Sequence, residues 1–470
     1  MPQRARHSSL IALGLTLSAC TAAGPATGGG GSNGRGDSGA LPDTGDSVPG
    51  DGALSVAPVG ASFPLSLRVA PAEPGALSFA VTATGGGITR GPFVWSGEGE
   101  PEVVVWGFPA GTSLTLEASL TTADATLASA SATAAVPLPD AEFPVVRGEV
   151  SNGGSSFRGF AVYPVLSPPG GLSTPTGAVV LVDERGALVW GATTANEMPT
   201  RARFRRDGRG VLVIGSRVES IGFDGSRQEW DIPAHHDVIE TPEGILATLS
   251  QEPVLDSAGN VIDVTDAITE ILPDGRRREV YALSQHLDAL GLIPGEPRRE
   301  GFDLTHANTI AYDEPSGTYV VGLASLPAVI AVNRFDGTLR GMVDARRRTG
   351  SPLQFDEQLT LTHEISLVDG GFTWFFNDTE AVDCAGILRV DWDFAGGPAS
   401  ARVQLRPRSC EHTFMLGGGM AVGDGLLATW STSGKSVFYE ADESATWAAV
   451  APFGNGLGYA DWAPSLPVSP

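Results

Sequence analysis

Histidine is the residue type in this chain whose spacing best predicts chemistry. The chain has 470 residues and only seven His. His236 and His363 each lie eight residues before the Gly of a Gly-rich turn, and His306 precedes Gly317 by eleven. The three spacings agree if the turn after His306 carries three extra residues. Each of these His lies at the start of a strand in a different repeated unit. We therefore expect the three imidazoles to converge.

A cluster of imidazoles supports two kinds of chemistry. Neutral imidazole is a common ligand of transition metals. It is also a competent nucleophile, and its neighbours can protonate a leaving oxygen or hold developing negative charge. Asp237 and Glu364 directly follow two of the His, so on a strand their side chains point to the opposite face. The matching place in the preceding unit is Thr200, which shows that the repeat itself does not require His there.

A repeated hairpin organises the chain from about residue 143 to 470. Asp-Gly or a similar turn between apolar runs is a strong hairpin signal. Six copies occur, and they begin at Val179, Ser220, Thr269, Ile330, Leu388 and Val437. An apolar strand after a Gly-rich turn precedes most copies, which gives four strands per unit. Six such units predict a six-bladed β-propeller, closed by a strand from the tail near 456–462.

An earlier region, residues 56–140, is predicted to fold separately. Its strand-like runs have the lengths and spacing of a small β-sandwich, similar to fibronectin type III or immunoglobulin modules. It contains no His and no Cys, so we expect a structural role. The predicted class is all-β throughout, and the stretch 281–300 is the one place where we expect a short helix or lid.

The first 20 residues predict a lipoprotein signal. A basic start and a short apolar run end in Leu-Ser-Ala-Cys at Cys20. This ending resembles a bacterial lipobox, and Thr21 after it resembles lipoproteins that are passed to an outer membrane. Residues 21–55 are mostly small and polar, which favours a flexible tether. We therefore expect a lipid-anchored protein of the cell envelope, on the periplasmic side of the outer membrane or on the cell surface.

Charge and cysteine content restrict the partners further. A net charge of −24 and a pI of about 4.6 argue against nucleic acid as a partner. Besides Cys20, the chain has Cys384 and Cys410, which either pair in an oxidising envelope or remain as buried thiols. Their spacing is not that of a metal site.

The segments around the His resemble those of the bacterial arylsulfate sulfotransferases. Residues 305–308, Thr-His-Ala-Asn, with Tyr-Asp at 312–313, resemble that family's Thr-His-x-Asn…Tyr-Asp segment. Residues 235–237 resemble its His-His-Asp segment, and residues 363–378 resemble its segment from His to Phe-Asp-Asn. The resemblance covers most of 143–470, and it implies a periplasmic six-bladed propeller preceded by a small β-sandwich.

What the resemblance implies is a ping-pong transfer that uses no nucleotide sulfate donor and no cofactor. A phenolic sulfate gives its sulfuryl group to a histidine, and a phenol then takes it. By position His363 matches the histidine that becomes sulfated. His236 and His306 match partners that bind sulfuryl oxygens or move protons, and His235 and Asn308 are predicted to bind substrate.

One position departs from the family pattern. The family carries an Arg in the strand after Thr-His-x-Asn, where this chain has Ala324. A guanidinium there would bind sulfate oxygens in a fixed fork, and its loss costs on the order of a few kcal/mol of transition-state stabilisation. Arg334 and the run 346–348 are the cations near it in sequence. Either another cation substitutes, or the substrate differs, or catalysis has been lost.

The alternative function is therefore an inactive propeller that binds a ligand, a metal or a protein through its His-lined channel. A quinone-dependent dehydrogenase propeller is disfavoured, because neither its repeated Trp docking motifs nor a clear calcium-binding set is present in the sequence.

Overall fold

The computed structural model describes residues 54–466, except 73–75, 96, 98, 123–126, 141–142, 167–176, 295–302, 346–352, 355–358, 380–383, 408–410, 412 and 414. The predicted lipid-attachment residue Cys20, the tether up to residue 53, Cys410 and the basic run 346–348 lie outside the described residues. Among the helices of the described part, none is long and apolar enough to cross a membrane.

Nearly all described elements are β-strands, which confirms the predicted all-β class. The helical elements of the described part are η1 (Leu283–Gln285), α1 (Leu287–Leu290) and η2 (Ser431–Ser433). The first two lie in the stretch 281–300, where a short helix was predicted.

Two antiparallel sheets form the first region. One has the order β1-β2-β5 and the other β4-β3-β6-β7. Their apolar side chains, including Val69, Val105, Phe79 and Leu116, are buried in a shared cluster. The strands are β1 (Leu54–Pro58), β2 (Leu67–Pro71), β3 (Ala76–Gly85), β4 (Ile88–Val94), β5 (Val103–Val105), β6 (Ser113–Thr122) and β7 (Leu127–Ala135).

Six further sheets follow one another in the described residues up to Ala463. The first three contain β9 (Phe160–Leu166), β10 (Ala178–Asp183) and β11 (Leu188–Thr193); then β12 (Arg201–Phe204), β13 (Gly210–Ile214), β14 (Val218–Gly222) and β15 (Arg227–Trp230); then β16 (Ala234–Glu240), β17 (Leu246–Leu255), β18 (Val261–Ile271) and β19 (Arg277–Ala282).

The remaining three sheets repeat this four-stranded plan. They contain β20 (Ala307–Asp313), β21 (Thr318–Leu323), β22 (Ala328–Asn333) and β23 (Leu339–Asp344); then β25 (Leu359–Val368), β26 (Gly371–Thr379), β27 (Gly386–Asp391) and β28 (Ala399–Leu405) with β24 (Leu353–Gln354); then β29 (Gly418–Val422), β30 (Gly425–Trp430), β31 (Lys435–Tyr439) and β32 (Ala445–Val450).

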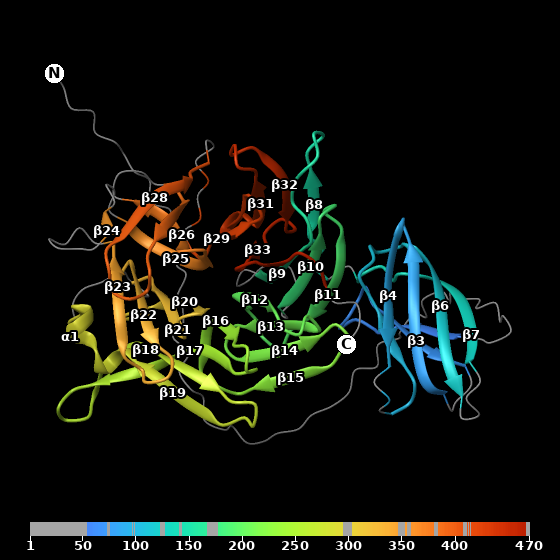
Figure 1. Ribbon diagram of the computed structural model, residues 1–470, viewed down its shortest axis with the longest axis horizontal. Helices are drawn as coiled ribbons and strands as arrows, with labels where there is room; N and C mark the ends of the chain where they lie inside the picture. The colour runs from blue at the N-terminus through green and yellow to red at the C-terminus, as the bar shows by residue number, and fades with distance from the viewer. Residues whose placement is uncertain are drawn as a thin grey trace, which may run out of the picture. The chain divides into compact units, whose positions relative to one another are not determined.

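The sheets are arranged as propeller blades, and in the second to sixth sheets the first of the four blade strands is innermost (Figure 1). β12 contacts β16, β16 contacts β20, β20 contacts β25 and β25 contacts β29. Burial decreases toward the outside of the blades. The second strand β21 is buried at every residue, whereas the outer strand β19 begins with three exposed charged residues, Arg277, Arg278 and Glu279. The starts of the inner strands therefore meet at one end of a common channel.

Two short strands close the ring. β33 (Gly456–Leu457) and β34 (Asp461–Ala463) both pair with β9, so the predicted closing strand from the tail is present. β8 (Arg147–Val150) pairs with β32 at the outer edge of the last sheet, which the sequence did not predict. Between β33 and β34, Tyr459 forms a parallel bridge with Arg201 and so reaches the inner strands.

Candidate active site

Each predicted His lies where an inner strand loses its regular pairing. The register shifts within 235–238 in β16, within 307–309 in β20 and within 362–365 in β25. His236 and His306 also have left-handed backbones, with φ values of 60° and 46°. Such conformations cost a non-glycine residue about 1–3 kcal/mol and are concentrated at functional sites. The surrounding fold therefore holds these two His against local strain.

The structure brings the imidazoles together. The ring centroids of His236 and His306 are 4.9 Å apart, with the planes at 65°. Those of His235 and His236 are 5.0 Å apart, at 78°. His363 is also close enough for its charge to act on His236. Thr200 occupies the matching place of the preceding blade, and its Oγ1 donates to the carbonyl of His236 at 3.2 Å.

His236 is held as a neutral imidazole. Burial lowers its pKa well below the ordinary value, and the neighbouring His306, His235 and His363 lower it further. Its Nδ1 is buried, with no hydrogen-bond partner among the described residues. An uncharged ring with an unsatisfied nitrogen is suited to bind a ligand or to act as a nucleophile.

His235 has the opposite environment, because a buried carboxylate lies beside it. Its Nε2 is 2.7 Å from Oδ1 of Asp266, whose side chain is 0% exposed. Burial alone would lower the pKa of His235, but Asp266, through its hydrogen bond and charge, and Asp303 outweigh this effect and raise it. Asp266 in turn accepts hydrogen bonds from the hydroxyl of Thr305 and the backbone N–H of Ala307.

His306 also has a carboxylate partner. Its Nδ1 lies 3.4 Å from Oδ1 of Asp303, three residues earlier in the chain. Burial would raise the pKa of Asp303, but the hydrogen bond and charge of His306, with the charge of His235, lower it instead. The other Asp303 oxygen accepts a hydrogen bond from Gln251 at 3.1 Å, so Asp303 is an ionised group between two imidazoles.

The hydrogen bonds around His363 determine which of its ring nitrogens carries the proton. The amide nitrogen of Asn377 donates to the carbonyl oxygens of Thr413 and Leu416 at 2.7 and 2.8 Å. The Asn377 oxygen is therefore an acceptor, and it receives the proton of His363 Nδ1. His363 Nε2 is then the basic nitrogen, and it accepts the backbone N–H of Leu416 at 3.0 Å.

Asn308 holds the strand that carries His363. Its amide nitrogen donates to the carbonyl of Thr362 at 3.0 Å, and its side chain is buried. Its Oδ1 has no hydrogen-bond partner among the described residues. This oxygen is thus available to accept a hydrogen bond from a ligand, as the predicted binding role of Asn308 requires.

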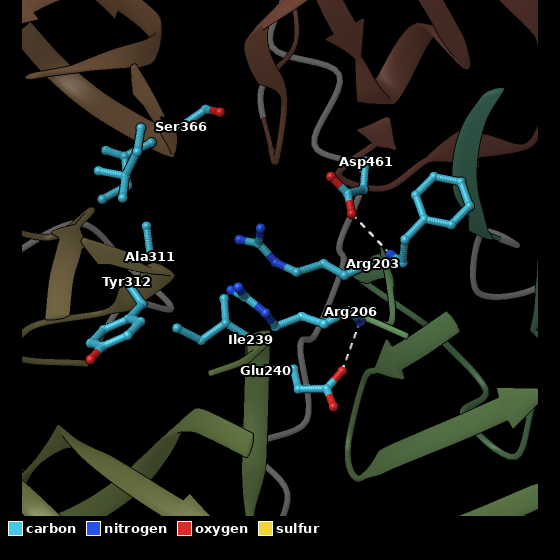
Figure 2. Close-up of a pocket in the computed structure, with 11 residues that line it drawn as sticks. Arg203, Arg206, Ile239, Glu240, Ala311, Tyr312, Ser366 and Asp461 are labelled. Atoms are coloured by element: carbon cyan, nitrogen blue, oxygen red, sulfur yellow. Dashed lines mark hydrogen bonds between the residues drawn. The ribbon is translucent and has the colours of Figure 1, made fainter. Parts of the chain in front are cut away.

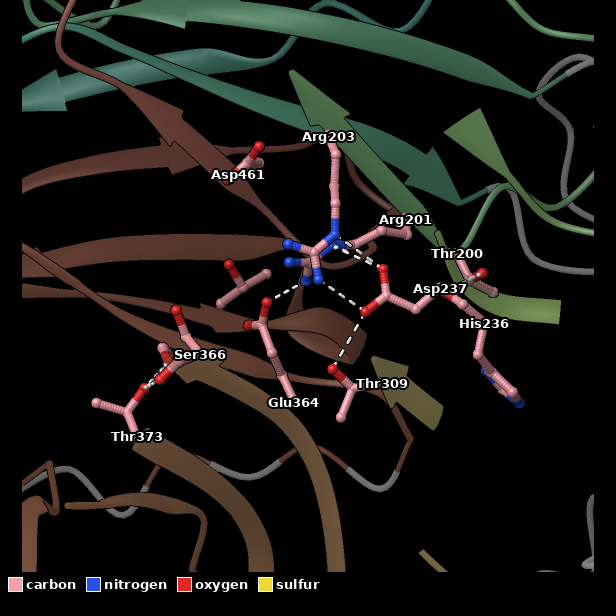
Figure 3. Close-up of polar contacts among 12 residues, drawn as sticks. Thr200, Arg201, Arg203, His236, Asp237, Thr309, Glu364, Ser366, Thr373 and Asp461 are labelled. Carbon is pink, nitrogen blue, oxygen red and sulfur yellow. Dashed lines mark hydrogen bonds and ion pairs between the residues drawn. The ribbon is translucent and has the colours of Figure 1, made fainter. Parts of the chain in front are cut away.

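Behind the imidazoles lies a buried network of ion pairs (Figure 3). Arg203 makes a two-pronged contact with Asp237, with N–O distances of 3.0 and 2.8 Å. Arg201 lies 3.5 Å from Asp237 and also pairs with Glu364. Thr309 donates to Asp237 at 3.1 Å. Asp237 and Glu364 thus point away from the His that precede them, as the sequence indicates.

The Asp237 carboxylate is ionised in this network. Burial would raise its pKa, but Arg203 and Arg201 lower it below the ordinary value. Both guanidinium groups are engaged by carboxylates, so each charge is balanced where it is buried.

A pocket of about 220 Å³ opens at the other end of the inner strands (Figure 2). The side chains of Arg203 and Arg206 extend into it, opposite Ala311 and Ser366. Asp461 accepts the N–H of Phe204 at its edge. We call this pocket the Arg end of the channel, and the cluster of His235, His236, His306 and His363 the His end.

Residues 172–377 match a family described as arylsulfotransferase (ASST). This part of the chain is similar to the arylsulfotransferase family. It contains all four His of the His end, so the predicted family is confirmed. This match supports an arylsulfotransferase-like function.

Outside the arylsulfotransferase family match, other comparisons are distant. No curated protein matches the chain. TolB from Acinetobacter baumannii has a TM-score of 0.40 and 9% identity, over 76% of this chain and 80% of that one. The periplasmic gluconolactonase PpgL from Pseudomonas aeruginosa has a TM-score of 0.39 and 12% identity, over 83% and 100%.

Several other His, Arg and Cys residues lie outside the His end. His286 stacks on Tyr281, with centroids 4.3 Å apart. Arg334 pairs with Glu270 and Glu243 at 2.8 and 2.7 Å, so it does not supply the family's missing cation. Cys384 is disulfide-bonded. Since Cys410 is outside the described residues, its pairing with Cys384 stays a prediction.

Sequence reasoning missed the carboxylates and guanidinium groups around the His. Arg201 follows Thr200, as Asp237 and Glu364 follow their His. The same alignment could therefore have predicted that these three side chains meet. Asp266 and Asp303 carry no such signal, apart from the closeness of Asp303 to His306 in sequence. In the described residues, no group of three or more His, Cys, Asp and Glu is arranged to hold a metal ion.

Proposed function

We propose that this protein transfers a sulfuryl group from a phenolic sulfate to a phenol through a sulfated histidine. The observation that carries the proposal is the convergence of His236, His306 and His363 from adjacent blades. Their environments differ: His363 has a defined basic nitrogen, and His306 has a carboxylate partner. A nucleophile and a proton donor are the two groups that such a transfer needs.

In the first half of the reaction, Nε2 of His363 attacks the sulfur of the donor. The S–N bond forms as the S–O bond to the phenol breaks, and His306 gives its proton to the departing oxygen. Asn377 holds the proton on Nδ1 and so keeps the lone pair on Nε2. The N–H of Leu416 donates to that lone pair, so this hydrogen bond must break before attack.

In the second half, a phenol replaces the first product. Neutral His306 takes the proton of the acceptor hydroxyl as its oxygen attacks the sulfur, and the S–N bond to His363 breaks. The charge returns to its starting distribution. His236, which is neutral and close to both, supplies a further N–H to the sulfuryl oxygens.

The test is the release of p-nitrophenol from p-nitrophenyl sulfate with a phenol as acceptor. His363→Ala should lower kcat/KM by at least about 10³-fold, because it removes the group that forms the covalent intermediate. His286→Ala, a histidine outside the His end, should keep the wild-type rate. Mass spectrometry of enzyme quenched without acceptor should show one added sulfuryl group on the peptide that contains His363.

A ligand-binding propeller without catalysis is the second candidate, and Ala324 in place of the family's Arg favours it. It predicts that wild-type protein releases no p-nitrophenol with any of a range of phenols. That result would overturn the sulfotransferase proposal.

The proposed location is the cell envelope, with the chain attached through lipid on Cys20. In the native host, Cys20→Ser should release the protein from the membrane fraction. Unchanged retention of this variant in that fraction would contradict the anchor.

A further inference from the structure

The place of the family's Arg is beside His306, and it holds no charge. The N–H of Ala324 donates to the carbonyl of His306 at 2.9 Å, so the two residues are neighbours on paired backbones. The Ala324 side chain is a buried methyl group, only 2% exposed. A sulfuryl group carries negative charge on its oxygens, so the His end needs positive charge from another source.

The Arg residues next to the His end are already engaged. Arg201 and Arg203 are bound to Asp237 and Glu364. Each of these contacts is a buried or half-buried ion pair, and breaking one would leave a carboxylate uncompensated. The guanidinium groups therefore serve the network behind the imidazoles and not a ligand in front of them.

Two imidazole–carboxylate pairs remain, on either side of His236. His235 lies 2.7 Å from Asp266, and His306 lies 3.4 Å from Asp303. The imidazoles are partly exposed, at 17% and 19%, whereas the carboxylates are less exposed, at 0% and 10%. In each pair the ring thus lies toward the solvent side and the carboxylate lies behind it.

We propose that the His235–Asp266 and His306–Asp303 pairs supply the positive charge that binds the sulfuryl oxygens, in place of the missing Arg. Asp266 and Asp303 are positioning residues: each acts through its imidazole. This inference rests on the proposed function for the identity of the anion. The proton that leaves with the first phenol comes from His306 and returns to it from the second, so Asp303 stays ionised throughout.

The charges around the two imidazoles agree with this role. His235 faces Asp266, Asp303 and neutral His236, and the two carboxylates raise its pKa although burial opposes them. His306 faces Asp303 and His236, and it contributes to the lowered pKa of Asp303. Sulfate should therefore bind more tightly as pH falls, because the ring of His235 becomes protonated.

The test measures binding of inorganic sulfate to the full chain by calorimetry, across pH 5 to 9. Asp303→Asn and Asp266→Asn each remove a carboxylate that raises the pKa of His235, so His235 is protonated only at lower pH. Each variant should bind sulfate about 10- to 100-fold more weakly than wild type near pH 8, because a hydrogen bond to a charged group is lost. The loss should disappear near pH 5, where His235 of the variants also becomes charged.

Three further variants make the result specific. Asp303→Glu keeps a carboxylate and should restore most of the binding at pH 8. Ala324→Arg, added to Asp303→Asn, should restore it too, because a guanidinium does not titrate in this range. Asp274→Asn, in an exposed turn of the β18–β19 hairpin, is the matched control and should leave binding unchanged. If Asp266→Asn does not fold, Asp303→Asn carries the test, because its carboxylate is 10% exposed.

Equal weakening at every pH, or no weakening, would overturn the inference, since both outcomes are those of a merely structural role. The transfer assay run in parallel separates this inference from the proposed function. If wild type binds sulfate with the expected pH dependence but transfers nothing, the transfer proposal fails and the charge assignment stands. If wild type transfers but the variant curves do not move, the charge assignment alone fails.

Discussion

The two ends of the channel use the same inner strands in opposite ways. At the His end, the strands are interrupted by register shifts, and His236 and His306 have strained backbones. At the Arg end, the same strands pair regularly, and Arg203 binds Asp237 through two hydrogen bonds. Backbone strain therefore occurs where chemistry is proposed, whereas ion pairs between buried side chains occur where the blades are held together.

The largest effect on stability is expected in the ion-pair network around Asp237. Asp237→Ala leaves Arg201 and Arg203 without their shared carboxylate, so the free energy of unfolding should fall by about 3–5 kcal/mol. Urea unfolding measures it. Glu229→Ala is the control, because the Arg217–Glu229 pair is exposed and contributes no more than about 1 kcal/mol. Equal small losses would show that the network does not hold the blades.

Two adjacent His should affect stability with opposite pH dependence. The pKa of His236 is lowered in the folded state. This His therefore destabilises the fold as pH falls below its pKa in the unfolded chain, about 6.5. The pKa of His235 is raised in the folded state. This His therefore stabilises the fold below about pH 6.5, and the stabilisation is lost as pH rises through the raised pKa.

Relative to wild type, His236→Asn should therefore gain stability at acidic pH, and His235→Asn should lose it there. Urea unfolding at several pH values between 5 and 8 measures both differences. Differences of the same sign would mean that the carboxylates do not distinguish the two rings.

Backbone strain at His236 has a smaller effect that can be measured by itself. Glycine tolerates a φ of 60° whereas alanine does not, so His236→Gly should be more stable than His236→Ala by about 1 kcal/mol. Both variants should lose transfer activity alike, since both lack the ring. A more stable alanine variant would contradict strain at this position.

The smallest effect is expected at the Arg end. Arg206 pairs with Glu314 at 3.1 Å, and both side chains are about half exposed. Arg206→Ala should lower the free energy of unfolding by less than about 1 kcal/mol and leave transfer unchanged. A large loss of transfer would place part of the reaction at the Arg end and remove the distinction between the two ends.

The blades and the convergence of the His were predictable because both depend on a repeated pattern. A turn and an apolar strand recur at similar spacing, so three His at one place in that pattern must meet on neighbouring strands. The resemblance to the arylsulfotransferases was predictable for the same reason, because the short segments that carry it lie at matching places in successive repeats.

The partners of the His were not predictable in the same way. Asp266 reaches His235 from the third strand of its blade, where pairing in space and not spacing in sequence sets the contact. Leu416 binds His363 through its backbone N–H, which every residue except proline has. The strand β8 is four residues long and largely exposed, so no apolar pattern marks it.

The closing strands have a consequence for biosynthesis. Tyr459 and Asp461 reach the channel from the segment that pairs with the inner edge of β9, and Arg201 lies over the ring of Tyr459. A polypeptide is made from its N-terminus, so the blades that carry the four His are complete well before residues 456–463 exist. Until then, the first sheet lacks its inner edge and Arg201 lacks an aromatic neighbour. Residues 456–463 therefore decide when the channel acquires its final form.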